Sequence, residues 1–379
     1  MTNHRSRHRR IATAALAAVL AFGAAACGSD ADAQPESEAA TATQPAATTN
    51  EADAVDAGSD DTIASTEPTT PTAPSIPDGI TLRVGDQGGG LEIPLRLSGE
   101  LDDLPYEVEF ATFASGPLVN EAFAADAIDV GIMGDTPALL SYAQGLDTVV
   151  VGIRASDGVA QTLVARPGSG IETLDDLAGK KVAWATGTNQ HGFVLRALDS
   201  VGLTADDVEQ VDVPLTDVAN VLAAEQADAA VLYDVFRPPY IDTHPDAVEL
   251  VNLQDFTRSY IYVLSRRAVV EESAQSAAIE DFVARLARSG VWVQDNPDEW
   301  IQAYYVEGQK QTPEYGRQAH EAQGFTEWVE VGGDALVAQQ EQADLFYDAG
   351  FLPEQVDLAP QFDPALTARF TNAITEALQ

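Results

Sequence analysis

From residue 80 onward the chain alternates between strand-like and helix-like segments, and this alternation restricts its fold more than any other feature. Short β-branched or period-two runs predict strands at residues 80–87, 106–113, 128–134, 147–153 and 161–165. Apolar residues at helical spacing lie between them, at 116–127 and 136–144. Such alternation predicts an α/β fold with a largely parallel, doubly wound sheet.

A second set of alternating segments follows Arg166-Pro167-Gly168. It predicts strands at 182–185, 208–213, 229–233 and 248–253, with helices at 190–198 and 217–226. A strand at 260–264 has the length to return to the first unit. Two such units joined by two extended crossings predict a bilobed clamshell, with residues 80–166 and 266–379 in lobe 1 and residues 167–265 in lobe 2.

The C-terminal third has the pattern of amphipathic helices. Apolar side chains fall on one helical stripe from Ile279 to Trp292, and on another from Leu336 to Tyr347. We expect these helices to pack on lobe 1. Their Trp and Tyr side chains are expected in its core rather than against a ligand.

The first 26 residues have the pattern of an export signal. Four arginines precede an apolar stretch at 11–23, and Ala24, Ala25 and Ala26 lead to Cys27. This ending looks like a bacterial lipobox, which implies cleavage before Cys27 and a lipid on that residue. The alternative is a plain secretory signal. Residues 27–79 then form the lipid anchor and an acidic tether, because their composition cannot bury enough apolar surface to fold.

Composition excludes several classes of function. Cys27 is the only cysteine, so the mature domain has no disulfide, no thiolate metal cluster and no catalytic cysteine. The formal charge of −40 argues against nucleic acid and against binding to anionic lipid through the protein surface. The motifs HExxH, GxSxG and GxxxxGK[ST] are missing from the chain, and no cofactor or metal is expected.

Three helix starts follow strand ends, and each offers free backbone N–H groups to an anion. In open α/β sheets ligands bind beyond the carboxyl ends of the strands. The expected ligand-binding residues are therefore Gln87, Ser115, Gly116, Asp135, Thr136, Thr188, Asn189, His191 and Asp234.

Several of these residues have a structural alternative. Asp135 is well placed as an N-cap, and Ser115 is either a cap or a ligand contact. His191 caps or packs, or else it contacts the anion. Gln87 donates to an oxyanion or is a solvated turn residue. Asp234 meets a cation, such as a ligand amine or Arg237, or is solvated.

Four segments resemble one family across residues 80–358. They are FASGPLVNEAFAADAIDVGIMGDTPAL at 113–139, GKKVAWATGTNQHGFVLRAL at 179–198, DAAVLYD at 228–234 and QADLFYDAGFLPEQVDL at 342–358. The family is that of bacterial ABC-transporter substrate-binding proteins for aliphatic sulfonates, taurine and nitrate, and the sulfonate branch is the most similar. That branch usually has Trp-Asp-Pro where this chain has Tyr233-Asp234-Val235.

The resemblance implies a periplasmic-binding-protein type II clamshell. It also implies a monomeric, non-enzymatic receptor on the outer face of the cytoplasmic membrane, which binds a sulfonate-like anion and docks on a membrane permease. Taurine, nitrate or a thiamine-pyrimidine precursor is the alternative ligand. Two other functions are an enzyme on the same scaffold, with Ser115, His191 and Asp234 as a triad, and a ligand sensor for a membrane kinase or adhesin.

Overall fold

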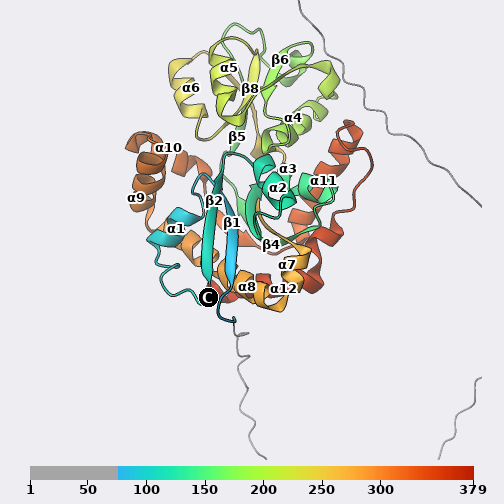
Figure 1. The fold of residues 1–379 in the computed structure, drawn as a ribbon. Coiled ribbons are helices and arrows are strands. Elements are labelled where there is room, and N and C mark those ends of the chain that lie inside the picture. The colour runs from blue at the N-terminus through green and yellow to red at the C-terminus, as the bar shows by residue number, and fades with distance from the viewer. Residues whose placement is uncertain (1–75) are drawn as a thin grey trace, which may run out of the picture. The chain divides into compact units, whose positions relative to one another are not determined.

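The computed structural model describes residues 76–379, and its folded part is built on two mixed β-sheets (Figure 1). The expected leader and Cys27 lie outside the described residues, as does the expected tether up to residue 75. Within residues 76–379 no helix combines the length and the apolar character needed to cross a membrane.

Sheet A has six strands in the order β11-β4-β10-β3-β1-β2. Their bounds are β1 (Thr81–Gln87), β2 (Glu107–Phe113), β3 (Val130–Gly134), β4 (Thr148–Ser156), β10 (Ser259–Arg266) and β11 (Thr326–Val329). Strand β1 is parallel to β2 and β3, whereas β10 is antiparallel to both β3 and β4. The sheet is therefore mixed, and the expectation of a largely parallel sheet was too simple.

Sheet B has five strands in the order β7-β6-β8-β5-β9. Their bounds are β5 (Gln161–Ala165), β6 (Lys181–Trp184), β7 (Glu209–Asp212), β8 (Ala229–Tyr233) and β9 (Val248–Asn252). Strand β5 is antiparallel to β8 and β9, and β6 is parallel to β7 and β8.

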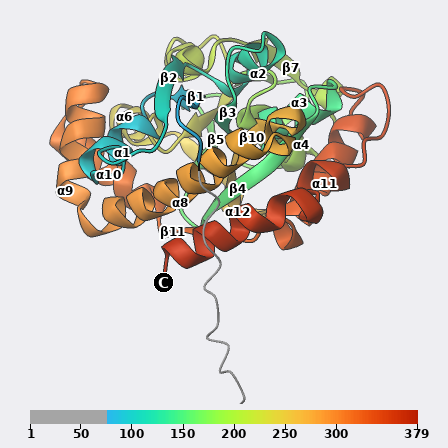
Figure 2. The same cartoon turned by 60° about the horizontal axis from the view of Figure 1, so that its bottom comes forward.

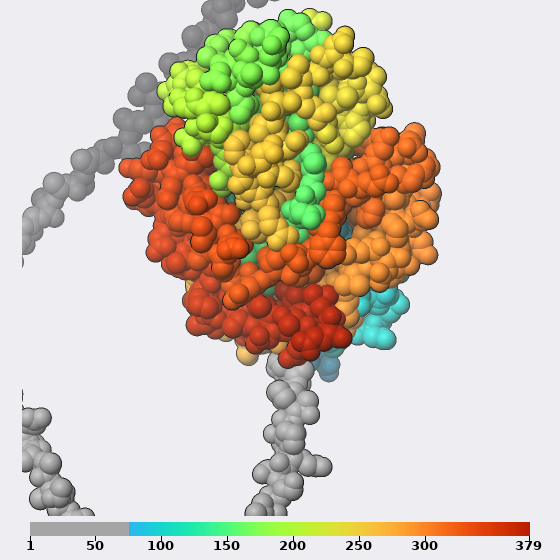
Figure 3. Space-filling view, turned by 180° about the vertical axis from the view of Figure 1, so that it is seen from behind, coloured from blue at the N-terminus to red at the C-terminus, as the bar shows by residue number. Residues whose placement is uncertain are grey.

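Strand pairing moves the boundaries between the two units from their expected places. Residues 161–165 were expected in lobe 1 but pair within sheet B. The strand at 260–264 does return to sheet A, as its length allowed, so the boundary expected at residue 265 lies too late in the chain. The sheet to which a strand belongs is decided by its backbone pairing, which a period-two pattern in the sequence does not reveal. The chain therefore crosses between the sheets at 157–160 and again at 253–258. Figure 3 shows the green and yellow stretches of these crossings running side by side.

Helices cover both faces of sheet A. The face toward α2 (Gly116–Ala124), α3 (Asp135–Ala143) and α11 (Gly333–Asp348) buries Val119, Met133, Leu139 and Phe346 in one cluster. On the opposite face, α8 (Ser273–Asp295) and α12 (Pro364–Ala377) bury Phe282 and Phe370 against β1, β3, β4 and β10 (Figure 2). The expected packing of the C-terminal helices on this unit is thus seen in the structure.

Sheet B is likewise covered on both faces. Helix α4 (Asn189–Asp199) buries Phe193 and Val194 on one side, and α5 (Val218–Ala223) and α6 (Arg237–Thr243) bury Leu222 and Tyr240 on the other. The remaining helical elements are α1 (Glu92–Leu97), α7 (Arg267–Glu271), α9 (Pro297–Trp300), the π-helical Ile301–Gly308 and α10 (Pro313–Gln323). Strand β11, which follows α10 in the chain, is an edge strand of sheet A. Sequence patterns did not predict it.

Candidate functional site

Three helix starts predicted to form the anion site do meet, but they pack tightly against each other. A Cβ atom on Gly134, at the start of α3, would overlap the side chain of Asn189, the first residue of α4. A Cβ atom on Gly187 would lie 3.5 Å from Pro117 Cγ in α2. The turn before α4 therefore contacts the sheet A unit directly, with little free space at this contact.

Side chains of the same turn already use its backbone groups. Thr188 caps α4, since its hydroxyl accepts from Gln190 N at 3.3 Å and donates to the Ala185 carbonyl at 2.8 Å. The buried Gln190 amide accepts from Ala185 N at 2.9 Å and donates to the Val231 carbonyl at 2.9 Å. The N–H groups of Ala185 and Gln190 are therefore not free for an anion, and Thr188 has the geometry of a helix cap.

His191 is a packing residue in this structure. Its ring lies edge-on to Phe351 at 4.3 Å and to Phe346 at 4.8 Å between centroids, and stacks near Trp184. Burial lowers the pKa of His191 to about 4, so the imidazole is neutral at pH 7. Its Nε2 has no hydrogen-bond partner among the described residues, which leaves Ser115, His191 and Asp234 without the contacts of a catalytic triad.

Asp135 and Thr136 belong to a buried polar network that joins α3, α11 and α4. The Asp135 carboxylate accepts from Thr136 N at 2.5 Å, and Gln342 Nε2 donates to Thr136 Oγ1 at 2.7 Å. Arg196 of α4 reaches Gln342 Oε1 at 3.2 Å. Burial raises the pKa of Asp135, an effect that the nearby Arg196 charge opposes. The helix cap position itself belongs to Gly134, with Asp135 as the first helical residue.

Gln87, Ser115 and Gly116 lie outside the cavity described next. Ser115 is the N-cap of α2 but its side chain makes no capping bond, and a Cβ on Gly116 would meet Pro137. Gln87 ends β1, and the residue before it, Asp86, accepts from the N–H groups of Leu91 and Glu92, each at 3.0 Å. The start of α1 is thus occupied by a side chain of the protein.

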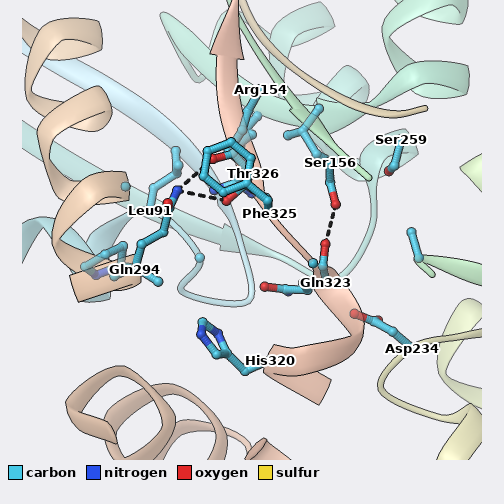
Figure 4. A pocket seen from close by; sticks show the side chains of 18 of the residues that line it. Leu91, Arg154, Ser156, Asp234, Ser259, Gln294, His320, Gln323, Phe325 and Thr326 are labelled. Carbon is cyan, nitrogen blue, oxygen red and sulfur yellow. Dashed lines mark hydrogen bonds between the residues drawn. The ribbon is translucent and has the colours of Figure 1, made fainter. Parts of the chain in front are cut away.

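A cavity of about 540 Å³ opens between sheet A, α8 and the 300–328 segment, and it reaches sheet B residues at its mouth. Of the predicted site residues, Asn189 and Asp234 line it. Figure 4 shows its polar rim, where Gln294 donates to the Thr326 carbonyl at 2.6 Å and Ser156 donates to the Gln323 carbonyl.

Arg154 is the cation of this cavity. It lies on β4, opposite Ile261 of β10 and Trp328 of β11, and its accessible surface faces the cavity. Among residues 76–379 its guanidinium makes no hydrogen bond and no ion pair, and burial lowers its pKa. An unpaired guanidinium in such a place is costly unless an anion joins it.

Aromatic side chains form another part of the cavity lining, although their indole nitrogens are themselves buried. The buried Trp300 and the half-buried Trp328 both line the cavity, and neither indole Nε1 has a partner in the described part of the chain. Tyr304 stacks on Trp300 at 4.4 Å between centroids. Burial, with the Asp86 and Asp234 charges, raises the pKa of Tyr304 to about 12, so its hydroxyl keeps its proton and remains a donor.

Asp234 faces the same cavity from the end of β8 and is 8% exposed. Its carboxylate accepts from Val235 N at 2.8 Å. Arg237, its expected partner, pairs with Glu249 at 2.7 Å instead. Burial raises the pKa of Asp234 to about 7, although Val235 N–H and the Arg237 charge oppose this.

The most informative cavity residues were missed by sequence reasoning. Arg154 was left just beyond a strand predicted to end at 153, whereas β4 extends to Ser156. An arginine within an otherwise apolar strand, TVVVGIRAS, was the available signal. Trp300, Tyr304 and Trp328 were not singled out, because they lie outside the two helical stripes that the sequence predicts, and Trp328 lies on a strand.

Comparison with known proteins identifies relatives. The model of the NMT1/THI5 like family matches residues 107–300, just over half of the 379 residues. The crystal structure of the periplasmic aliphatic sulphonate binding protein SsuA from Escherichia coli is 25% identical, with a TM-score of 0.66 over 74% of this chain and 91% of that one. The alkanesulfonate-binding protein SsuA from Xanthomonas axonopodis pv. citri, bound to MOPS, is 24% identical, with a TM-score of 0.67 over 75% and 98%. The fold is therefore that of the periplasmic binding proteins.

Proposed function

The chain belongs to the NMT1/THI5-like family, and from that membership and its cavity we propose that it is the solute-binding component of an ABC importer. Its ligand is a small organic anion, with an aliphatic sulfonate as the first candidate. The SsuA proteins, named as sulfonate-binding, support this choice through similarity over most of their length.

The observation that carries the proposal is the unpaired guanidinium of Arg154 inside the cavity. A sulfonate group is a permanent anion with three acceptor oxygens. Arg154 supplies the opposite charge, and the Tyr304 hydroxyl, which keeps its proton, is a further donor in the cavity lining. Each charge-assisted hydrogen bond contributes about 1.5–3 kcal/mol net, so Arg154 and one or two neutral donors supply much of the roughly 8 kcal/mol of a micromolar site.

The chain's negative charge does not prevent this binding. Surface charges farther than about 8 Å are largely screened at physiological salt, whereas contacts inside a cavity are not. Asp234 is the carboxyl group that could oppose anion binding, since it lines the same cavity as Arg154. Its raised pKa means that near pH 7 a fraction of the molecules present a neutral carboxyl, which can donate a hydrogen bond to an anion.

A receptor role is favoured over catalysis because the alternative triad of Ser115, His191 and Asp234 does not assemble. Asp234 lines the cavity, whereas His191 is packed among aromatic rings and is not part of the cavity lining. The other parts of the proposal come from sequence: a lipid on Cys27, a flexible tether, a single-copy receptor and a permease as the membrane partner.

Arg154→Gln tests the proposal. We expect the dissociation constant for an alkanesulfonate, measured by calorimetry, to rise roughly 10- to 150-fold, because one charge-assisted interaction is lost. The ligand-free variant should melt at a higher temperature than the unaltered protein, because an unpaired buried charge is gone. If Arg154 served only to stabilise the fold, the Arg154→Gln variant would instead melt at a lower temperature than the unaltered protein.

The matched control is Arg317→Gln, which removes the same charge from an exposed pair with Glu314. It should leave sulfonate affinity within about twofold, since exposed pairs contribute little. Unchanged affinity in Arg154→Gln would contradict the assignment of the anion site. Binding of no member of a panel of sulfonates, taurine and nitrate would contradict the proposed function itself.

A further inference from the structure

A groove on the outer surface of helix α11 forms a second hollow, separate from the cavity that holds Arg154. Helix α11 lies outside α3 at the edge of the sheet A unit (Figure 1), and it turns Ala335, Ala343 and Phe346 toward the core. The groove lies between the outer face of α11 and residues 357–359, and its volume is about 340 Å³. It shares no lining residue with the cavity. We call this hollow the α11 groove.

The floor of the α11 groove is apolar. It is formed by Leu336, Val337 and Ala359. The sequence places Val337 within an apolar stripe, yet its side chain is 57% exposed and belongs to none of the apolar clusters formed by residues 76–379. A single exposed valine is common on protein surfaces, but this one lies in a hollow with two other apolar residues.

One side chain, Gln340, holds the two walls of the groove together. Its amide nitrogen donates to the Val356 carbonyl at 2.9 Å, and its amide oxygen accepts from Leu358 N at 3.0 Å. These two bonds fasten the wall opposite α11 to the helix. Within that wall Asp357 accepts from Ala359 N at 3.0 Å. A partner therefore finds the groove already formed and does not have to order it.

Carboxylates surround the apolar floor. Glu341, Asp344 and Asp357 line the groove, and none of them forms an ion pair with another residue in the described part of the chain. The sequence has no lysine or arginine from 318 to 368. Arg267 approaches the same wall but is paired with two other carboxylates. The negative charge of the rim is thus not neutralised within the protein, which favours a partner of positive charge.

The acidic side chains continue along α11 beyond the groove. Asp334, Glu341, Asp344 and Asp348 fall at the spacing of one helix face, and all are exposed. From Asp334 to Asp348 the helix rises about 21 Å. Charges spread over that length do not match a small cation, whereas an extended peptide spans them with about six residues. The face therefore suits a segment of a protein chain better than a free amine.

Two other occupants are disfavoured by their charge. Residues 28–79, the expected tether, have many aspartates and glutamates but no lysine or arginine, so the acidic rim repels them. A second copy of the chain carries 60 acidic and 20 basic residues, and it is repelled in the same way. The groove is therefore expected to receive a different protein with a basic segment.

We propose that the α11 groove is a docking site for another protein, which inserts apolar side chains from a short segment rich in arginine or lysine. The apolar side chains cover Leu336, Val337 and Ala359, and the basic ones pair with the carboxylates of the rim. This inference goes beyond the proposed function and does not depend on the cavity. If the chain is the receptor of an importer, the membrane permease is the first protein to search for such a segment.

Two fluorescently labelled peptides test the inference on the unaltered protein. Both have eight residues with four arginines and two glycines, and they differ at the centre, where one has two leucines and the other two serines. At physiological salt, anisotropy should give a dissociation constant at least about tenfold lower for the leucine peptide, because apolar burial adds to the attraction between charges. Equal affinity for the two peptides, or binding of neither, would overturn the inference.

Charge substitutions locate the bound peptide. Glu341→Gln with Asp344→Asn removes two rim charges and should weaken binding of the leucine peptide at least about threefold. The control, Asp206→Asn with Asp246→Asn, removes two exposed carboxylates from the sheet B unit and should leave affinity nearly unchanged. Equal losses in the two variants would also overturn the inference, because only the overall charge would then matter.

Ala359→Trp tests the apolar floor without a change of charge. Its ring fills the groove, so the preference for the leucine peptide should be lost, whereas Ala368→Trp on the exposed face of α12 should keep it. An unchanged preference in a folded Ala359→Trp variant would overturn the inference, and the two peptides decide it on the unaltered protein if this variant does not fold. Sulfonate affinity should stay the same in every variant, so failure of the docking site and failure of the proposed function are distinguishable.

Discussion

Replacing Asp234 by Asn removes a buried carboxyl from the cavity, and the structure fixes how the effect depends on pH. Burial raises the pKa of Asp234 from 3.8 to about 7. The folded protein therefore keeps a proton that the unfolded chain releases between these two values. Because the folded state binds more protons, the free energy of unfolding falls as pH rises through this window.

The magnitude follows from the size of the pKa difference. A difference of about 3 corresponds to about 4 kcal/mol of destabilisation, fully present above pH 7 and absent below pH 3.8. Asparagine has nearly the same shape and no charge. The stability of Asp234→Asn relative to the unaltered protein should therefore increase by about 2–3 kcal/mol between pH 5 and pH 8, and by less where cavity water hydrates the carboxylate.

Urea denaturation of both proteins at pH 5 and pH 8 measures this difference. Asp242→Asn, which removes an exposed carboxylate from α6, serves as the control and should show no such change. A difference between Asp234→Asn and the unaltered protein that stays constant with pH would refute the reasoning. Calorimetry adds a second test, since sulfonate affinity should fall above pH 7 in the unaltered protein but not in Asp234→Asn.

Two other predictions concern the contact between α4 and the sheet A unit. His191→Phe should keep ligand affinity and make the protein less sensitive to acid. The pKa of His191 is lowered from 6.5 to about 4, so the unaltered protein loses up to about 3 kcal/mol of stability as pH falls between those values. Denaturation of both proteins at pH 7 and pH 4.5 measures this difference. Gly134→Ala should destabilise the protein by about 1–3 kcal/mol because its Cβ overlaps Asn189, and Asn189→Ala should restore most of that loss, which a double-mutant cycle of melting curves would show.

Much of the fold could be predicted because local patterns dictate it. Side chains alternate between apolar and polar at residues 80–87, and they are continuously apolar at residues 229–233. Both segments form strands close to the predicted limits. The direction of strand pairing could not be predicted in the same way. Strand β10 looks like any other short apolar run, and only its partners β3 and β4 show that it returns antiparallel to sheet A.

The site was harder to predict than the fold because its residues come from distant segments. Of the residues predicted to bind ligand, Asp234 and Asn189 line the cavity, and Asp234 was chosen because it follows a buried strand. Helix starts at Ser115, Asp135 and Thr188 looked equally suitable, yet backbone N–H groups at the starts marked by Asp135 and Thr188 already donate to these side chains. Free donors cannot be told from occupied ones by sequence, because an acceptor such as the Gln190 side-chain oxygen, which accepts from Ala185 N, is brought to its donor only by folding.

The two crossings between the sheets have a mechanical consequence. Ser156 and Ser259 pair at the ends of β4 and β10, next to both crossings, and they also line the cavity. If the sheet B unit rotates about the two crossings, atoms beside this pair move least and the far edge of the unit moves most. A molecule held in the cavity would then act close to the pivot. Spectroscopic labels should therefore be attached far from the cavity, where a small change in angle produces the largest change in distance.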